Sequence, residues 1–219
     1  GTPNEDTLVF DTVGGRVRPL HKKDTVIKTS PETPCYIMQT LNLSGVDVLT
    51  FYDSGANNNL VNSALAENIG FRLLSRNLIR FGVAGGGSVD SNCGQYAAVL
   101  GPDRNGDYHD VECQGVDTIT SVFPRFDLAP LHPAAARYLP GPGPNLPPVI
   151  GGDEVKLLIG IRSTQLAPQL MFTMPGGLCV YRSVFTDIWR SEYCFGGPHA
   201  IFTEAYIRAK GSHHANVPQ

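Results

Sequence analysis

The chain has 219 residues and a formal net charge of −3, a length that suits one domain with appendages or at most two small domains. The slightly acidic balance gives no reason to expect a nucleic-acid partner or an anionic membrane surface. No apolar stretch approaches the roughly 18 residues of a membrane-spanning helix, and 24 glycines and 17 prolines favour an all-β chain rich in turns.

The cysteines and histidines give no sign of a metal site. The five cysteines are odd in number and form no C-x-x-C pair, and the six histidines are scattered without metal-ligand spacing. A disulfide framework or a zinc site is therefore not expected. Buried reduced thiols fit a cytoplasmic protein, and we expect neither a metal nor another cofactor.

The first part of the chain predicts an arm followed by a hairpin. Residues 1–33 are polar and irregular apart from short apolar runs at 7–10 and 25–27, and we expect them to form an N-terminal arm. Residues 35–43 alternate loosely, Ser44-Gly45 makes a turn, and the apolar run 46–52 follows. This pattern predicts a β-hairpin whose second strand leads directly into an aspartate.

That aspartate, Asp53, stands in the sequence Asp53-Ser54-Gly55-Ala56-Asn57. A glycine allows a sharp turn and a close backbone approach, and a preceding buried strand fixes the carboxylate in space. An aspartic protease presents its acid in this way. The alternative is a turn aspartate that hydrogen-bonds its own backbone, which is common in such sequences.

Three further local structures are predicted downstream. Asn62 or Ser63 can cap a short helix that ends at Gly70. The three consecutive glycines at 85–87 predict a flexible hairpin over residues 82–88. Asn105-Gly106 predicts a hairpin turn between strands near 96–100 and 111–113.

The second half begins with a segment rich in proline, residues 124–148, which contains eight prolines. We expect it to be either a mobile insertion or a rigid polyproline-like spacer, with no regular structure beyond a helical turn near 133–138. Residues 139–148 are expected to lie on the surface and to contribute nothing to catalysis. The apolar run 157–159, closed by Gly160, predicts a buried strand. Residues 170–172 and 178–181 predict two further strands, and 209–219 are expected to be disordered.

The order of these segments resembles that of a known protease family. The acid turn at Asp53, the glycine-rich hairpin and Leu157-Leu158-Ile159-Gly160 resemble the retropepsins, the single-lobe aspartic proteases of retroviruses and retroelements. Further matches at Val122-Phe123-Pro124, at 177–183 and at 196–199 resemble the protease segment of BEL/Pao-type retrotransposon polyproteins. The core of the resemblance covers about residues 35–162. Where family members often have an acidic residue after the apolar-apolar-Gly run, this chain has Ile161-Arg162.

The resemblance implies a fold and a division of the chain. We expect an all-β, retropepsin-like closed antiparallel β-barrel with one short helix, plus N- and C-terminal extensions. The protease domain would span 34–162, with the proline-rich insertion at 124–148, and 163–219 would be the C-terminal extension.

The resemblance also implies an activity: an aspartic endopeptidase that cleaves a retroelement polyprotein, with a polypeptide as its substrate. Peptide hydrolysis of this kind needs two carboxyl groups that share a proton. The chain holds one Asp-Ser/Thr-Gly sequence, so the second carboxyl would come from another copy in a symmetric homodimer. Asp53 is then the catalytic residue, and Ser54 and Gly55 support it. Ala56, Asn57, Gly85, Gly86 and Gly87 would contact the substrate.

Two other functions fit the same residues. One is a catalytically silent retropepsin-like module for dimerisation or peptide binding, which the Ile161-Arg162 difference and the long proline-rich segment favour. The other is a structural piece of a polyprotein, in which 163–219 connects the protease to a following polymerase. Cleavage of a peptide library in the acid range, blocked by pepstatin-type inhibitors, separates the endopeptidase from both.

Overall fold

The computed structural model describes residues 8–11, 16–19, 34–76, 79–82, 88–91 and 94–198. The chain divides into two compact units, Gly1–Glu32 and Thr33–Gln219. In the first unit, β1 (Leu8–Asp11) and β2 (Arg16–Pro19) pair antiparallel. Within the described residues, no helix is both long and apolar enough to cross a bilayer.

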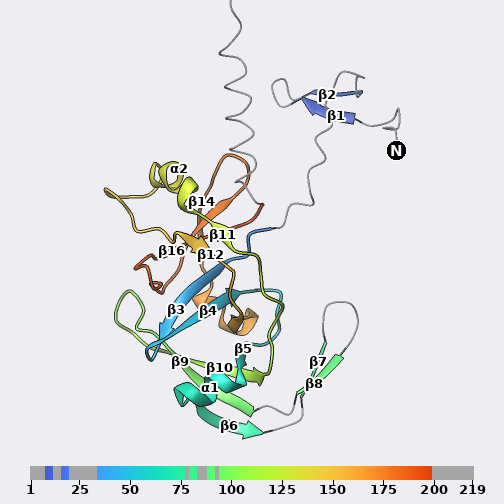
Figure 1. Cartoon of the computed structure of the whole chain (residues 1–219), viewed down its shortest axis with the longest axis vertical. Helices are drawn as coiled ribbons and strands as arrows, with labels where there is room; N and C mark the ends of the chain where they lie inside the picture. Colours follow the sequence, from blue (N-terminus) through green and yellow to red (C-terminus); the bar gives the residue numbers. More distant parts are fainter. Residues whose placement is uncertain are drawn as a thin grey trace, which may run out of the picture. The chain divides into compact units, whose positions relative to one another are not determined.

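A seven-stranded mixed sheet forms the centre of the second unit (Figure 1). From one edge to the other it consists of β3 (Met38–Leu43), β4 (Val46–Tyr52), β13 (Val155–Ile159), β5 (Leu60–Asn62), β10 (His109–Val116), β9 (Gly94–Leu100) and β6 (Arg72–Arg76). Strand β13 runs parallel to β4 and antiparallel to β5, and β10 runs parallel to β5. Strands that are distant in sequence therefore lie side by side at the middle of the sheet.

This sheet corrects the expected closed antiparallel barrel. The strand order ends at β3 and β6, which do not pair with each other in the described chain, and two of the strand pairs are parallel. The sequence pattern identified short strands and turns, but it favoured pairing between neighbours in sequence. The parallel pairs arise because β13 and β10 return to the sheet through long connections, as parallel strands require.

Both faces of the central strands are covered. In β4, Val48 belongs to one apolar cluster and Leu49 to another, because successive side chains of a strand point to opposite faces. Val48 is fully buried beside Val61 and Leu157, and Leu49 lies in the cluster that includes Phe195. The strand that leads to Asp53 is thus held between two cores.

The local predictions for the first half of the sheet are confirmed. Strands β3 and β4 form the expected hairpin with a turn at Ser44-Gly45, and β9 and β10 pair antiparallel around the turn that contains Gly106. Helix α1 (Ser63–Ile69) begins after Asn62, whose side chain accepts a hydrogen bond from the Leu65 N–H. It ends at Gly70, which adopts a left-handed conformation with φ of 85°.

The glycine-rich hairpin is described only at its base. Strands β7 (Ile79–Gly82) and β8 (Ser88–Ser91) pair antiparallel, with Gly82 opposite Ser88. This pairing confirms a hairpin. Residues 83–87, including the predicted tip, lie outside the described residues.

The proline-rich segment is more ordered than we expected. It contains β11 (Phe126–Asp127), which pairs with β12 (Val149–Ile150), the 3₁₀ turn η1 (Ala129–Leu131) and helix α2 (His132–Ala136). Four leucines of the segment are buried in one apolar cluster: Leu128, Leu131, Leu139 and Leu146. The expectation of a segment without regular structure is therefore wrong, and the expected surface position of 139–148 is wrong at Leu139 and Leu146, because leucines between the prolines provide core side chains.

Residues 161–198 pack onto the same sheet. They form η2 (Ile161–Leu166), β14 (Gln169–Thr173), β15 (Cys179–Arg182) and β16 (Tyr193–Gly196), the last three in one antiparallel sheet. The predicted strands near 170–172 and 178–181 are confirmed. Cys35 and Gly197 exchange two backbone hydrogen bonds of 2.8 Å, which join this part to the segment before β3.

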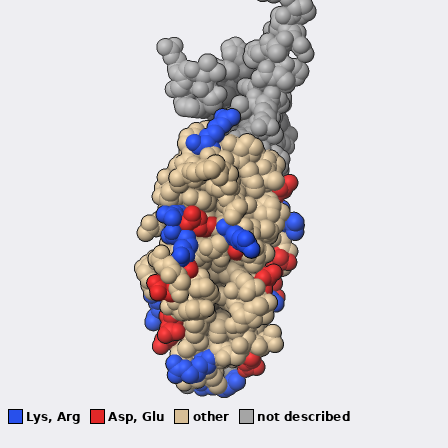
Figure 2. Space-filling view, turned by 90° about the vertical axis from the view of Figure 1, so that its left-hand side faces the viewer, with Lys and Arg blue, Asp and Glu red and all other residues tan. Residues whose placement is uncertain are grey.

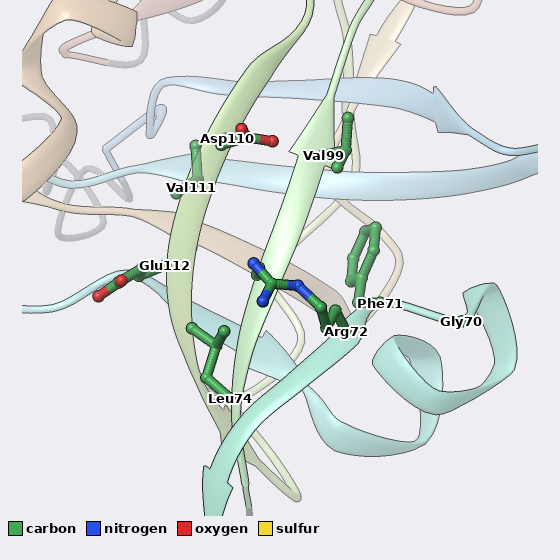
Figure 3. Close-up of a pocket in the computed structure, with 9 residues that line it drawn as sticks. Gly70, Phe71, Arg72, Leu74, Val99, Asp110, Val111 and Glu112 are labelled. Carbon is green, nitrogen blue, oxygen red and sulfur yellow. The ribbon is translucent and has the colours of Figure 1, made fainter.

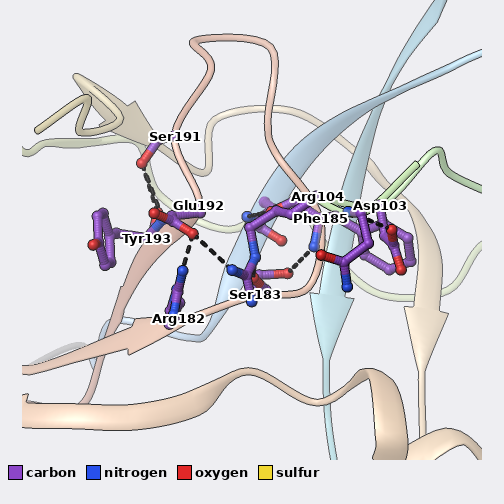
Figure 4. A network of polar contacts seen from close by, with 10 residues as sticks. Asp103, Arg104, Arg182, Ser183, Phe185, Ser191, Glu192 and Tyr193 are labelled. Carbon is purple, nitrogen blue, oxygen red and sulfur yellow. Dashed lines mark hydrogen bonds and ion pairs between the residues drawn. The ribbon is translucent and has the colours of Figure 1, made fainter. Parts of the chain in front are cut away.

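A charged network connects the β9–β10 turn to the same three-stranded sheet (Figure 4). Arg104 and Arg182 both bind Glu192, with nitrogen–oxygen distances of 3.2 and 2.9 Å. Arg104 also donates to the Ser183 carbonyl at 2.9 Å. The β9–β10 connection is thereby tied to the strands after residue 179.

Candidate active site

The Asp53 turn is held by a strand inserted between the two strands that flank it. β4 leads into the turn, β5 leaves it, and β13 lies between them in the sheet. The Asp53 N–H donates to the Ile159 carbonyl at 3.0 Å, and the Ile161 N–H donates to the Ala56 carbonyl at 2.9 Å. Within the turn, the Ala56 N–H donates to the Asp53 carbonyl at 3.1 Å. Both sides of the turn are therefore fixed by backbone hydrogen bonds.

Gly160 allows this close approach. A Cβ atom built at Gly160 would lie 2.7 Å from the carbonyl oxygens of both Ala56 and Asn58. Its φ of −99° is open to any residue, so the requirement for glycine is one of space. The predicted apolar-apolar-Gly strand thus packs directly against the predicted acid turn.

The Asp53 side chain is half-buried, and Ser54 and Gly55 are exposed. The Gly55 N–H donates to one carboxylate oxygen of Asp53 at 2.9 Å, a contact that an ordinary turn aspartate also makes. Within the described residues, nothing hydrogen-bonds the Ser54 hydroxyl. A carboxylate and a hydroxyl are thus presented on a rigid, accessible turn.

Asn59 was missed in the sequence and is the main support beneath the turn. Its side chain is 3% exposed, and its Oδ1 accepts from the Gly160 N–H at 2.8 Å. Its Nδ2 donates to the Ser163 hydroxyl at 2.9 Å and to the Glu112 carbonyl at 3.1 Å. One amide therefore joins the end of β13 to η2 and β10. In the sequence, only the position of Asn59 just before an apolar strand could have indicated this role.

Two residues of η2 form one border of the turn. Ile161 is 47% exposed although its backbone is bonded to Ala56. Arg162 is exposed, and its Nε donates to the Asn57 carbonyl at 3.1 Å. An apolar and a cationic side chain thus stand beside the residues that follow Asp53.

The structure brings some of the predicted site residues together. Asp53, Ser54, Gly55, Ala56 and Asn57 lie in one turn. The predicted substrate-contacting glycines Gly85, Gly86 and Gly87 lie outside the described residues.

Three buried cysteine thiols are unsuited to act as a competing nucleophile. Burial raises the pKa of Cys35 and of Cys113 to about 12, and it also raises the pKa of Cys194. Thiols with raised pKa values hold almost no thiolate near neutral pH. Among the described residues, no group of three or more His, Cys, Asp or Glu side chains could hold a metal ion.

A shallow groove lies on another part of the sheet (Figure 3). Arg72, Leu74, Val99, Asp110 and Glu112 line it, from β6, β9 and β10. None of the predicted site residues is among its lining residues. On the face shown in Figure 2, acidic and basic side chains are interspersed, so that face carries no large region of one sign.

No protein-family model, curated protein or solved structure matches this chain. The resemblance to retropepsins therefore stays an expectation from the sequence. The structure adds the placement of the Asp53 turn against β13 and Gly160.

Proposed function

We propose that the chain is an aspartic-type endopeptidase in which Asp53 acts as one half of a catalytic pair. One observation carries the proposal: the Asp53 carboxylate is accessible on a turn that is fixed on one side by Ile159 of β13 and on the other by Ile161 of η2. Catalytic groups need this combination of access to substrate and rigid placement.

The chemistry requires a second carboxyl group, which a second copy of the chain supplies across a two-fold axis. Two carboxyls a few ångströms apart share one proton. The ionised carboxyl takes a proton from water as the water oxygen attacks the peptide carbonyl carbon, and the protonated carboxyl donates its proton to the carbonyl oxygen. Collapse of the tetrahedral intermediate breaks the C–N bond, and the amine leaves with a proton from the pair.

The neighbouring residues have supporting roles in this proposal. The Gly55 N–H orients the Asp53 carboxylate, and the Ser54 hydroxyl is available to the partner copy. Ala56 and Asn57 border the substrate backbone, and Gly85, Gly86 and Gly87 close over it and exclude water.

The cellular setting is also a proposal. The resemblance to BEL/Pao-type segments supports a role in processing a retrotransposon polyprotein. Cys35, Cys113, Cys179 and Cys194 are free thiols, which fits the reducing environment of the cytoplasm.

The test replaces Asp53 with asparagine. Asp53→Asn is nearly isosteric and should leave the fold intact, but it should abolish hydrolysis of a peptide library because an amide cannot accept the proton of water. Wild-type activity should follow a bell in pH with an acid maximum. Asp110→Asn, at an exposed position of β10, is the control and should retain full activity.

A mixing experiment tests the pair itself. Wild-type protein mixed with an excess of Asp53→Asn protein forms dimers with a single carboxylate, so activity should fall further than dilution alone predicts. Near-normal turnover by Asp53→Asn would contradict the proposal. It would leave Asp53 as a turn residue of a peptide-binding or dimerisation module, for which the Gly55 contact suffices.

A further inference from the structure

Arg162 is anchored beside the Asp53 turn through its Nε, and its other N–H donors are available for a ligand. Its Nε donates to the Asn57 carbonyl. A guanidinium group carries five N–H donors in a planar fork, so four remain after this bond. Within the described residues, no carboxylate pairs with Arg162, whereas Arg76, Arg104 and Arg182 each bind a glutamate.

The backbone under Arg162 is fixed, which distinguishes it from an ordinary surface arginine. The preceding residue, Ile161, is bonded through its N–H to Ala56. The following residue, Ser163, is 6% exposed and holds the buried Asn59 amide. The bond from Arg162 Nε to Asn57 holds the side chain itself on this fixed backbone. Less side-chain freedom is therefore lost when Arg162 binds a partner, and that loss is one reason why exposed ion pairs are weak.

The same border carries an apolar contact. Ile161 leaves 47% of its surface exposed next to Ala56, immediately before Arg162. A peptide laid along residues 56 and 57 would meet an aliphatic side chain and then a guanidinium group. Together they match a peptide with an apolar residue near an acidic one.

We propose that Arg162 determines specificity by binding the carboxylate of a Glu or Asp side chain in the peptide substrate, with Ile161 as the adjoining apolar contact. This inference rests on the proposed function, since it names the substrate class of the same site. It gives a role to Arg162, which in the resemblance to retropepsins stood only as a difference.

Binding is measured first, without catalysis. Full-length Asp53→Asn protein is titrated with fluorescein-labelled apolar octapeptides that carry Glu, Gln or Lys at each position in turn. At one or two positions, Glu should bind about fivefold more tightly than Gln, and Lys more weakly than Gln. Arg162→Gln in the same background should abolish the difference, and Arg162→Glu should reverse it in favour of Lys.

The pH dependence separates charge recognition from a structural role. A peptide glutamate has a pKa of about 4.3, while arginine stays protonated. The Glu-over-Gln preference should therefore be full near pH 6 and fade as the pH falls through about 4. Arg137→Glu, at an exposed position that follows helix α2, is the matched control and should keep the preference.

Each outcome decides the inference. Equal binding of Glu and Gln peptides, no binding of any peptide, or an equal loss for all peptides in Arg162→Glu would overturn it. Cleavage of the same peptides by wild-type protein without a Glu preference overturns the inference and leaves the endopeptidase intact. Glu-selective binding without any cleavage supports the inference about Arg162 and contradicts the proposed endopeptidase activity.

Discussion

At the scale of single residues, the buried amide of Asn59 shows how the site is supported. It makes three side-chain hydrogen bonds, to Gly160, Ser163 and Glu112. Each of these partners would lose a hydrogen bond in a buried or half-buried place if the amide were removed. A buried polar group without a partner costs about 1–3 kcal/mol.

We therefore expect Asn59→Ala to lower the free energy of unfolding by at least about 2 kcal/mol, measured by urea denaturation. It should also lower peptide cleavage, because Gly160 and the Asp53 turn share this support. Asn145→Ala is the control: Asn145 is exposed and donates to the Arg190 carbonyl, so its loss should change stability by about 0.5 kcal/mol or less. Equal effects of the two variants would contradict this role.

The sequence indicated only some of these residues. Asp53 and Gly160 stand in short patterns with a physical meaning, an acid turn and a closely packed strand end, and the structure places them together. Asn59 and Ser163 are 104 residues apart, and neither stands in a pattern. Their contact arises only because β13 is placed beside β5, which local sequence does not specify.

At the scale of elements, the proline-rich segment contributes to the core. Leu131 is 2% exposed and lies in the cluster that contains Val155 and Phe195. Prolines limit backbone freedom, so this segment loses less entropy on folding. Its leucines then add buried apolar surface.

We expect Leu131→Ala to lower the free energy of unfolding by about 2–5 kcal/mol, the usual range for truncation of a buried leucine. Val122→Ala, at a position that is 59% exposed, should change it by about 0.5 kcal/mol or less. Thermal or urea denaturation of both variants checks the difference. A negligible effect of Leu131→Ala would show that the segment adds little to the core, as a mobile insertion would.

Element prediction succeeded where the determinants are local. Helix α1 has an Asn cap and a glycine stop within nine residues, and the β3–β4 hairpin has its turn signal between the paired strands. The closed barrel failed because strand order depends on pairings between distant segments. The prediction for the proline-rich segment failed because its proline content indicates irregular structure, whereas its spaced leucines reach the core.

At the scale of the whole molecule, Asp187 makes stability depend on pH. Asp187 is 6% exposed, and its carboxylate accepts hydrogen bonds of 2.8 Å from the N–H groups of Trp189 and Ser191. Burial nevertheless outweighs these bonds and raises its pKa from 3.8 to about 6. The folded protein therefore binds the proton of Asp187 more tightly than the unfolded chain does.

The sign of the effect follows from linkage. A raised pKa in the folded state contributes stability that is fully present below pH 3.8 and lost as the pH rises through about 6. Relative to Asp187→Asn, which does not titrate, wild-type protein should lose about 1–2 kcal/mol between pH 4 and pH 7. Urea denaturation of both proteins at a series of pH values measures this difference. A constant difference across the range would show that Asp187 does not titrate there.

The position of β13 between β4 and β5 has a consequence for biosynthesis. β4, the Asp53 turn and β5 are complete by residue 62, but the strand that separates them begins at Val155. At 5–20 residues per second, a ribosome needs on the order of 5–20 s to make the chain between these points. During that interval the Asp53 amide lacks the Ile159 carbonyl and the Asn59 side chain lacks the Gly160 N–H. A nascent chain that is still being elongated through this region therefore contains Asp53 but lacks the hydrogen bonds that hold its turn in place.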